Sequence, residues 1–226
     1  MTFKGIIFDF NGVLLLDAPL HVEAWQRSAL ELRGSPLSDE EFAQHVHGRT
    51  NSHILGYLTG RELFGTELHE LTQTKESLYR SLCLAQPATF VLSPGAEELL
   101  DYLVAHDIPR TIATASEKTN LDFFIEHLKL ERWFDISKIV YDDGTFPGKP
   151  APDMYARAAI NLGLPAPDCI VVEDAISGFK SAHAAGIGHI IALGLQPSHA
   201  RLRACEGVGR VIESFEELPR DELFGM

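Results

Sequence analysis

The first residue of this chain that suggests chemistry is Asp9, which ends the apolar run Ile6-Ile7-Phe8 and is followed by Phe10-Asn11-Gly12. A carboxylate at the end of a buried strand can attack phosphorus and form an aspartyl-phosphate, which divides one difficult displacement into two easier ones. Alone, the pattern is weak, because many strands end at an aspartate that only caps a turn. Asp9 is therefore a candidate nucleophile whose interpretation depends on the rest of the chain.

Three further stretches follow in a fixed order, and each places a reactive or phosphate-binding side chain beyond an apolar run or before a helix. Open α/β sheets keep their sites at such positions. The stretches are Ile112-Ala113-Thr114-Ala115-Ser116, Gly148-Lys149-Pro150-Ala151-Pro152-Asp153, and Val171-Val172-Glu173-Asp174-Ala175-Ile176-Ser177-Gly178. With the Asp9 stretch they resemble the haloacid dehalogenase superfamily, specifically its β-phosphoglucomutase-like and phosphoglycolate-phosphatase-like branch with a helical cap. The resemblance covers essentially the whole chain.

The resemblance implies a role for each motif in phosphoryl transfer. Asp9 is expected to be the nucleophile, and Lys149 is expected to reach both the nucleophile and the phosphoryl oxygens as a cation. Thr114 is expected to hydrogen-bond a transferring phosphoryl oxygen, with Ala115 and Ser116 supplying donors at the N-terminus of the next helix, where anions are favoured. The structural alternative for Thr114 and Ser116 is an ordinary helix N-cap.

A divalent cation is the expected cofactor. Glu173 and Asp174 follow the apolar run from Cys169 to Val172, and together with Asp9 they offer the oxygen ligands that a hard cation prefers. Asp174 is the stronger ligand candidate, and Glu173 is expected to bind directly or through water. The resemblance adds the backbone carbonyl of Asn11 to the ligands and indicates Mg²⁺.

Asn11 departs from the resembling phosphatases and mutases, in which an Asp at this position protonates the leaving oxygen and then activates water. An amide does neither, and general acid–base catalysis typically contributes roughly 10²–10⁴-fold. The loss should be severe for sugar-phosphate esters and mild for acyl phosphates. Three explanations stay open. The chain is a working phosphatase or, less favoured, a phosphomutase that recruits another acid such as Asp17, or it is a non-catalytic relative that binds a phosphate ligand. In the third explanation, Asn11 was altered to trap a complex, or the Asn-Gly step deamidates and restores an Asp.

Hydrophobic periodicity predicts a doubly wound parallel sheet with an all-helical insert. Helical stretches separate the expected strands, which alternate as in α/β folds and lie at residues 3–8, 108–114, 137–141, 169–173, 187–193 and 208–212. Residues 17–88 contain no strand pattern, so we expect an α/β core from residues 1–16 and 89–226 and a helical cap from 17–88. In that cap, His21 and Arg49 lie where the resembling enzymes select substrate.

Composition limits the partners. The formal net charge of −13 argues against binding to nucleic acid or an anionic membrane, so we expect a small phosphorylated metabolite as substrate. Three cysteines without metal spacing and the lack of an apolar leader favour a cytoplasmic protein. We expect a monomer or weak dimer.

Overall fold

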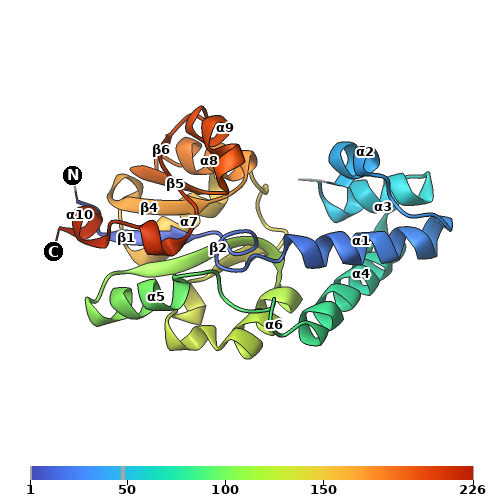
Figure 1. Ribbon diagram of the computed structural model, residues 1–226, viewed down its shortest axis with the longest axis horizontal. Helices are drawn as coiled ribbons and strands as arrows, with labels where there is room; N and C mark the ends of the chain where they lie inside the picture. Colours follow the sequence, from blue (N-terminus) through green and yellow to red (C-terminus); the bar gives the residue numbers. More distant parts are fainter. Residues whose placement is uncertain (1, 47–48, 226) are drawn as a thin grey trace. The chain divides into compact units, whose positions relative to one another are not determined.

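The computed structural model describes residues 2–46 and 49–225. Its centre is a six-stranded parallel sheet with the strand order β3-β2-β1-β4-β5-β6 (Figure 1). The strands are β1 (Gly5–Phe8), β2 (Arg110–Glu117), β3 (Val140–Asp142), β4 (Cys169–Glu173), β5 (His189–Leu193) and β6 (Val208–Ile212). The predicted α/β fold with a parallel sheet is confirmed, with all six strands close to their expected positions.

The central strands are apolar along their whole length because both faces of the sheet are covered. All four residues of β1 and all five residues of β4 are buried, which is the pattern that parallel strands adopt between two helical layers. β2 continues to Glu117, three residues beyond the expected end, and its last residues, Ala115–Glu117, lose the full burial of the strand interior. The extension matters because it places Ser116 in the strand, two residues after Thr114.

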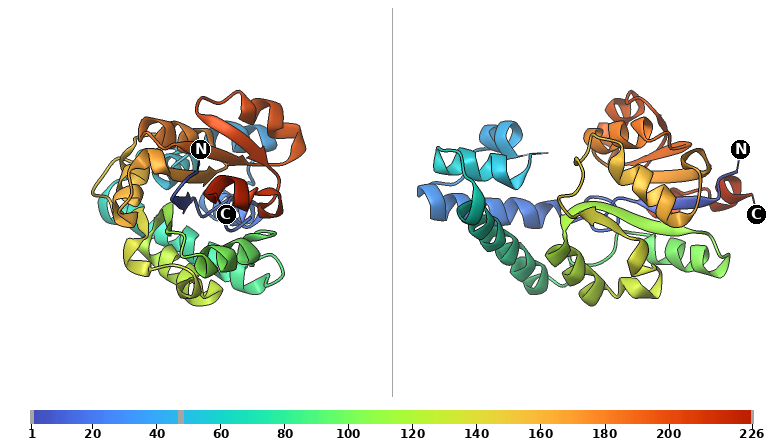
Figure 2. Two further views of the ribbon diagram at one scale, coloured as in Figure 1. Left: turned by 90° about the vertical axis from the view of Figure 1, so that its left-hand side faces the viewer. Right: turned by 180° about the vertical axis from the view of Figure 1, so that it is seen from behind.

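Helices cover the two faces of the sheet. On one face α7 (Asp153–Leu162) and α8 (Ile176–Ala184) bury Tyr155, Ala158 and Phe179 against Ile7 and Val171. On the other face lie α5 (Ala96–Ala105) and α6 (Lys118–Leu128) (Figures 1 and 2). The short helices α9 (His199–Arg203) and α10 (Arg220–Phe224) follow later in the chain.

The strand order reverses direction beside β1, which pairs with β2 on one side and β4 on the other. The chain runs outward through β2 and β3, crosses back to β4, and continues outward through β5 and β6. Ligands of open α/β sheets bind outside the carboxyl ends of the strands at such a switch point. The residues that follow β1, β2 and β4 are therefore placed at one edge.

The chain divides into two compact units, one made of Met1–Leu16 with Val91–Met226 and the other of Asp17–Phe90. The first unit closes across the insertion, because Leu15 and Leu92 form an antiparallel bridge. Ser93 strengthens this closure: its backbone N–H donates to Leu14 O at 2.9 Å, and its hydroxyl donates to Val13 O. The chain thus leaves and re-enters the sheet domain through two adjacent segments.

The second unit is helical in all of its regular elements within residues 17–46 and 49–90. Its α-helices are α1 (Ala18–Arg33), α2 (Asp39–Glu41), α3 (Asn51–Thr59) and α4 (Gly65–Ala85), and Phe42–Val46 forms a π-helical turn after α2. Its core is apolar and includes Trp25, Ala29, Ile54, Leu55 and Leu58. No helix in the described part of the whole chain has the length and apolar character needed to cross a membrane.

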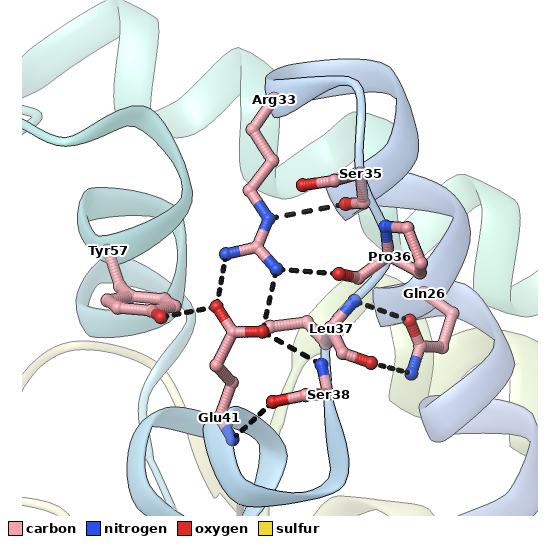
Figure 3. Close-up of polar contacts among 8 residues, drawn as sticks. All are labelled: Gln26, Arg33, Ser35, Pro36, Leu37, Ser38, Glu41 and Tyr57. Atoms are coloured by element: carbon pink, nitrogen blue, oxygen red, sulfur yellow. Dashed lines mark hydrogen bonds and ion pairs between the residues drawn. The ribbon is translucent and has the colours of Figure 1, made fainter.

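A polar network fixes the segment between α1 and α2 (Figure 3). Arg33 makes two bonds to Glu41, at 2.6 and 3.0 Å, and the Tyr57 hydroxyl donates to the same carboxylate at 2.6 Å. Ser38 and Glu41 form a reciprocal capping box at the start of α2. Arg33, the Ser38 N–H and Tyr57 hold the pKa of Glu41 well below its usual range, so these bonds are made to a carboxylate at neutral pH.

Gly188, which precedes β5, provides a test of the packing in the sheet domain. A Cβ atom at this position would lie 1.9 Å from the carbonyl oxygen of Pro167, so Gly188→Ala must move backbone atoms. Overpacking of this kind typically costs about 1–3 kcal/mol, and we expect a melting temperature several degrees lower by circular dichroism. Gly148→Ala is the control, because its added Cβ meets no atom within 4 Å. Equal melting of both variants would contradict this close approach.

Candidate active site

Two carboxylates and one lysine meet at the carboxyl edge of the sheet. Asp9 directly follows β1, Glu173 ends β4, and Lys149 comes from the loop that leads to α7, where its peptide bond to Pro150 is cis. Lys149 Nζ lies 2.6 Å from Asp9 Oδ1 and 2.6 Å from Glu173 Oε1. The three side chains are each at least nine-tenths buried. The ammonium group therefore bridges two acids that come from neighbouring strands.

Burial and the neighbouring charges shift the pKa values of this group. Desolvation, opposed by Lys149 and reinforced by Glu173, raises the pKa of Asp9 to about 7. Burial alone would lower the pKa of Lys149, but the charges of Asp9 and Glu173 outweigh it and raise that pKa well above its usual value. The lysine is therefore a permanent cation, while Asp9 is only partly ionised at neutral pH.

Asp174 extends the acidic group toward solvent. One carboxylate oxygen from each of Asp9, Glu173 and Asp174 lies within 4.8 Å of the others, a spacing that suits a bound cation. Desolvation and the charges of Glu173 and Asp9 raise the pKa of Asp174 well above its ordinary value. Three acids with one lysine among them form an oxygen donor set that fits a hard divalent ion.

Glu173 differs from Asp9 because four donors already engage its two oxygens. Oε1 accepts from Lys149 Nζ and from the Tyr155 hydroxyl at 3.1 Å, and Oε2 accepts from the backbone N–H groups of Asp174 and Ala175 at 2.6 and 2.7 Å. A carboxylate has about four such acceptor positions. Direct coordination by Glu173 would displace one of these donors, so a contact through water suits it better.

The Asn11 amide is held by Ser116 from the next strand. Ser116 Oγ donates to Asn11 Oδ1 at 2.8 Å, and the Ser116 backbone N–H donates to Thr114 Oγ1 at 3.1 Å. Thr114 is buried, and its hydroxyl keeps a hydrogen with which it can donate. The sequence suggested that Ala115 and Ser116 begin a helix, but they belong to β2, and α6 begins only at Lys118. The prediction that these two residues supply donors at a helix N-terminus is therefore wrong about their position.

Two glycines allow the backbone to approach the acids. Gly12 has a φ of 82°, and a Cβ atom there would lie 2.3 Å from Asp174 Oδ2. Gly178 in α8 faces Glu173 so closely that a Cβ atom would lie 1.6 Å from Oε1. Side chains at these positions would push the carboxylates out of place. Both glycines are therefore required by the geometry of the acidic group.

Tyr155 is a site residue that the sequence analysis missed. Its hydroxyl donates to Glu173 and its ring centroid lies 5.0 Å from Lys149 Nζ, a distance at which a cation interacts with an aromatic face. It lies on α7 among Met154, Ala158 and Ala159, which form an ordinary apolar helix face. The local sequence therefore contains no signal that separates it from the core.

His21 and Arg49 belong to the helical unit. His21 Nδ1 lies 3.1 Å from Lys75 Nζ, and His21 Nε2 lies 3.2 Å from Asp17 Oδ2. Asp17 also accepts a hydrogen bond from the Tyr79 hydroxyl, so the acid that the sequence offered as a substitute is already engaged within this unit. Arg49 is exposed, and the preceding Gly48 of its loop lies outside the described residues.

Comparison with known proteins identifies the family of this chain. The model of the haloacid dehalogenase-like hydrolases matches residues 3–186. The crystal structure of a haloacid dehalogenase hydrolase of family IA, variant 3, from Entamoeba histolytica is similar, with a TM-score of 0.91, 38% identity and 98% of each chain covered. A probable pseudouridine-5′-phosphatase of Saccharomyces cerevisiae is 35% identical, with 96% of this chain and 95% of the relative covered.

Hexitol phosphatase A of Escherichia coli is 29% identical, with 96% of this chain and 94% of the relative covered. The relatives with which this chain aligns over most of its length thus include phosphatases of phosphorylated sugars and metabolites. The match of the family model over most of the chain confirms the resemblance that the four motifs indicated. The chain belongs to the haloacid dehalogenase-like hydrolases.

Proposed function

We propose that this protein is a magnesium-dependent phosphatase that acts on a small phosphorylated metabolite through an aspartyl-phosphate at Asp9, with a phosphomutase as the less favoured alternative. The observation that carries the proposal is the buried Asp9–Lys149–Glu173 group beside Asp174. It joins a nucleophile, a permanent cation and an oxygen donor set at one point of the sheet edge. The names of the phosphatase relatives support the same reaction class.

Asp9, Asp174 and the backbone carbonyl of Asn11 are the proposed direct ligands of Mg²⁺, with Glu173 acting through water. The bound ion would neutralise the charge of the acids and of the phosphoryl oxygens. The raised pKa values of Asp9 and Asp174 come mainly from burial of the two carboxyl groups, and a bound cation would favour their charged forms.

The other side chains would bind and orient the phosphoryl group. Lys149 holds Asp9 in place and stabilises charge on the phosphoryl oxygens, and Thr114 donates its hydroxyl hydrogen to one of them. Ser116 holds the Asn11 amide. Asp9 then attacks phosphorus, the bond from phosphorus to the leaving oxygen breaks, and the phosphoryl group is bound to Asp9.

The helical unit of residues 17–90 is the proposed cap, and His21 and Arg49 are its proposed substrate contacts. Lys75 and Asp17 already engage both ring nitrogens of His21, so its proposed contact is through the exposed part of a fixed imidazole ring. Arg49 is suited because it is exposed and positively charged. Both would recognise the part of the metabolite that distinguishes one phosphate ester from another.

Asn11 favours a second candidate function, a phosphate-ligand-binding relative that retained the fold and the cation but lost turnover. The two functions differ in one measurable respect. A phosphatase with Asn11 releases phosphate slowly in a reaction that needs Asp9. A binding protein releases none, and Asn11→Asp does not restore release.

The affinity for Mg²⁺ should depend on pH. The pKa of Asp9 is about 7 without the ion, so binding at lower pH must displace a proton. The apparent dissociation constant measured by titration calorimetry should fall roughly tenfold between about pH 6 and about pH 8. Asp174→Asn should weaken binding at every pH, whereas the exposed Asp122→Asn should not. A dissociation constant independent of pH would contradict the proposed role of Asp9 as a ligand.

Asn11→Asp should restore acid catalysis in the step that forms the phosphoenzyme. We expect kcat/KM for alkyl phosphate esters to rise by roughly 10²-fold or more, with a much smaller rise for acyl phosphates, whose leaving carboxylates need no proton. Asn161→Asp on the exposed end of α7 is the matched control and should leave kcat/KM unchanged. Asp9→Asn should abolish the reaction with both substrate types.

An equal rise in kcat/KM for esters and acyl phosphates would show that position 11 does not act on the leaving group. No rise with either substrate, with both proteins confirmed by mass spectrometry, would favour the binding protein instead.

A further inference from the structure

In the resembling enzymes the acid at position 11 serves two steps of the reaction, and only one of them depends on the substrate. Protonation of the leaving oxygen matters for alkyl esters and hardly at all for acyl phosphates. Activation of water against phosphorylated Asp9 is needed whichever donor was used, because the intermediate is the same. Asn11 therefore imposes a deficit on the second step that no choice of donor removes.

The bond to Ser116 identifies the acceptor and donor groups of the Asn11 amide. Its Oδ1 accepts the Ser116 hydroxyl hydrogen at 2.8 Å, so its other side-chain group is the NH₂, which can only donate. A donor can orient a water molecule but cannot take its proton. The Ser116 hydroxyl does not change this, since its hydrogen is already directed at Asn11.

Other acids close to Asp9 do not replace the missing base. Glu173 accepts four hydrogen bonds, from Lys149, Tyr155 and two backbone N–H groups, which fill the acceptor positions of a carboxylate. Asp174 is a proposed metal ligand, so its carboxylate would bind the cation and would not be available as a base. Within the described residues, the acids adjoining Asp9 are thus occupied by other contacts.

The backbone also protects the amide from conversion to an aspartate. Deamidation at an Asn-Gly step requires attack of the glycine nitrogen on the asparagine side-chain carbon. The Gly12 N–H donates to Leu15 O at 2.7 Å, and this bond holds the nitrogen in the turn. The structure thus favours a lasting Asn11 and disfavours restoration of the acid by deamidation.

From these contacts we propose that acyl phosphates phosphorylate Asp9 and that the resulting phosphoaspartate persists, so that the protein stores a phosphoryl group. The inference rests on the proposed function. In the first step a bond forms between an Asp9 oxygen and phosphorus, and the bond from phosphorus to the acyl oxygen breaks. The carboxylate leaves with the electron pair and needs no proton. In the second step water must lose a proton as it attacks, and Asn11 cannot accept it.

The test is to incubate the protein with acetyl phosphate and MgCl₂ and to follow its intact mass over time after removal of the donor. We expect an added mass of one phosphoryl group, mapped to Asp9 and removed by hydroxylamine. The phosphorylated form should decay roughly 10²-fold or more slowly than that of Asn11→Asp. Asn161→Asp should behave like the parent protein, and Asp9→Asn should remain unlabelled.

Each other outcome overturns the proposal in a distinguishable way. If phosphate is released in an Asp9-dependent reaction without an added mass, the intermediate does not persist and the proposed function remains. Decay as fast as in Asn11→Asp, or label on another residue, also overturns storage at Asp9. If neither the parent nor Asn11→Asp releases phosphate from acetyl phosphate or from esters, both the proposed function and the storage of a phosphoryl group at Asp9 are wrong.

Discussion

A single buried ammonium group holds this site together. Lys149 lies between Asp9 and Glu173, two carboxylates whose mutual repulsion in a desolvated pocket would otherwise keep one of them protonated. Buried charges persist only when they are paired and hydrogen-bonded. The pairing requires that β1 and β4 be neighbours and that the loop before α7 return to their ends. The switch in strand order and the covering helices therefore serve one electrostatic arrangement.

Most of the fold could be predicted from the sequence because parallel strands that are buried on both faces consist of continuous apolar runs. The apolar runs before Asp9 and before Glu173 were sufficient to predict β1 and β4. The end of β2 was predicted less well, since its last residues, Ala115–Glu117, are no longer buried but the strand continues to pair with β3 at Glu117. The π-helical turn at Phe42–Val46 was also not predicted, because periodicity does not distinguish it from an α-helix.

The site was predictable where a motif carries it and not where the contact is long-range. Asp9, Lys149 and the two acids at the end of β4 were found because each belongs to a recognisable motif. The bond from Ser116 to Asn11 joins residues 105 positions apart, and the Tyr155 hydroxyl reaches Glu173 from an ordinary apolar helix face. Such contacts depend on packing that no local pattern records. The saturation of Glu173 by four donors became visible only with the coordinates.

The bridge between Leu15 and Leu92 has a consequence for how this protein can change. Backbone bonds close the sheet domain where the chain leaves it and returns to it. The entropic cost of closing the segment between Leu15 and Leu92 grows only slowly with the number of residues in that segment. The intervening residues have their own apolar core around Trp25 and Ile54. The insert is therefore a module that evolution can lengthen, shorten or exchange while the sheet and its charged edge keep their geometry.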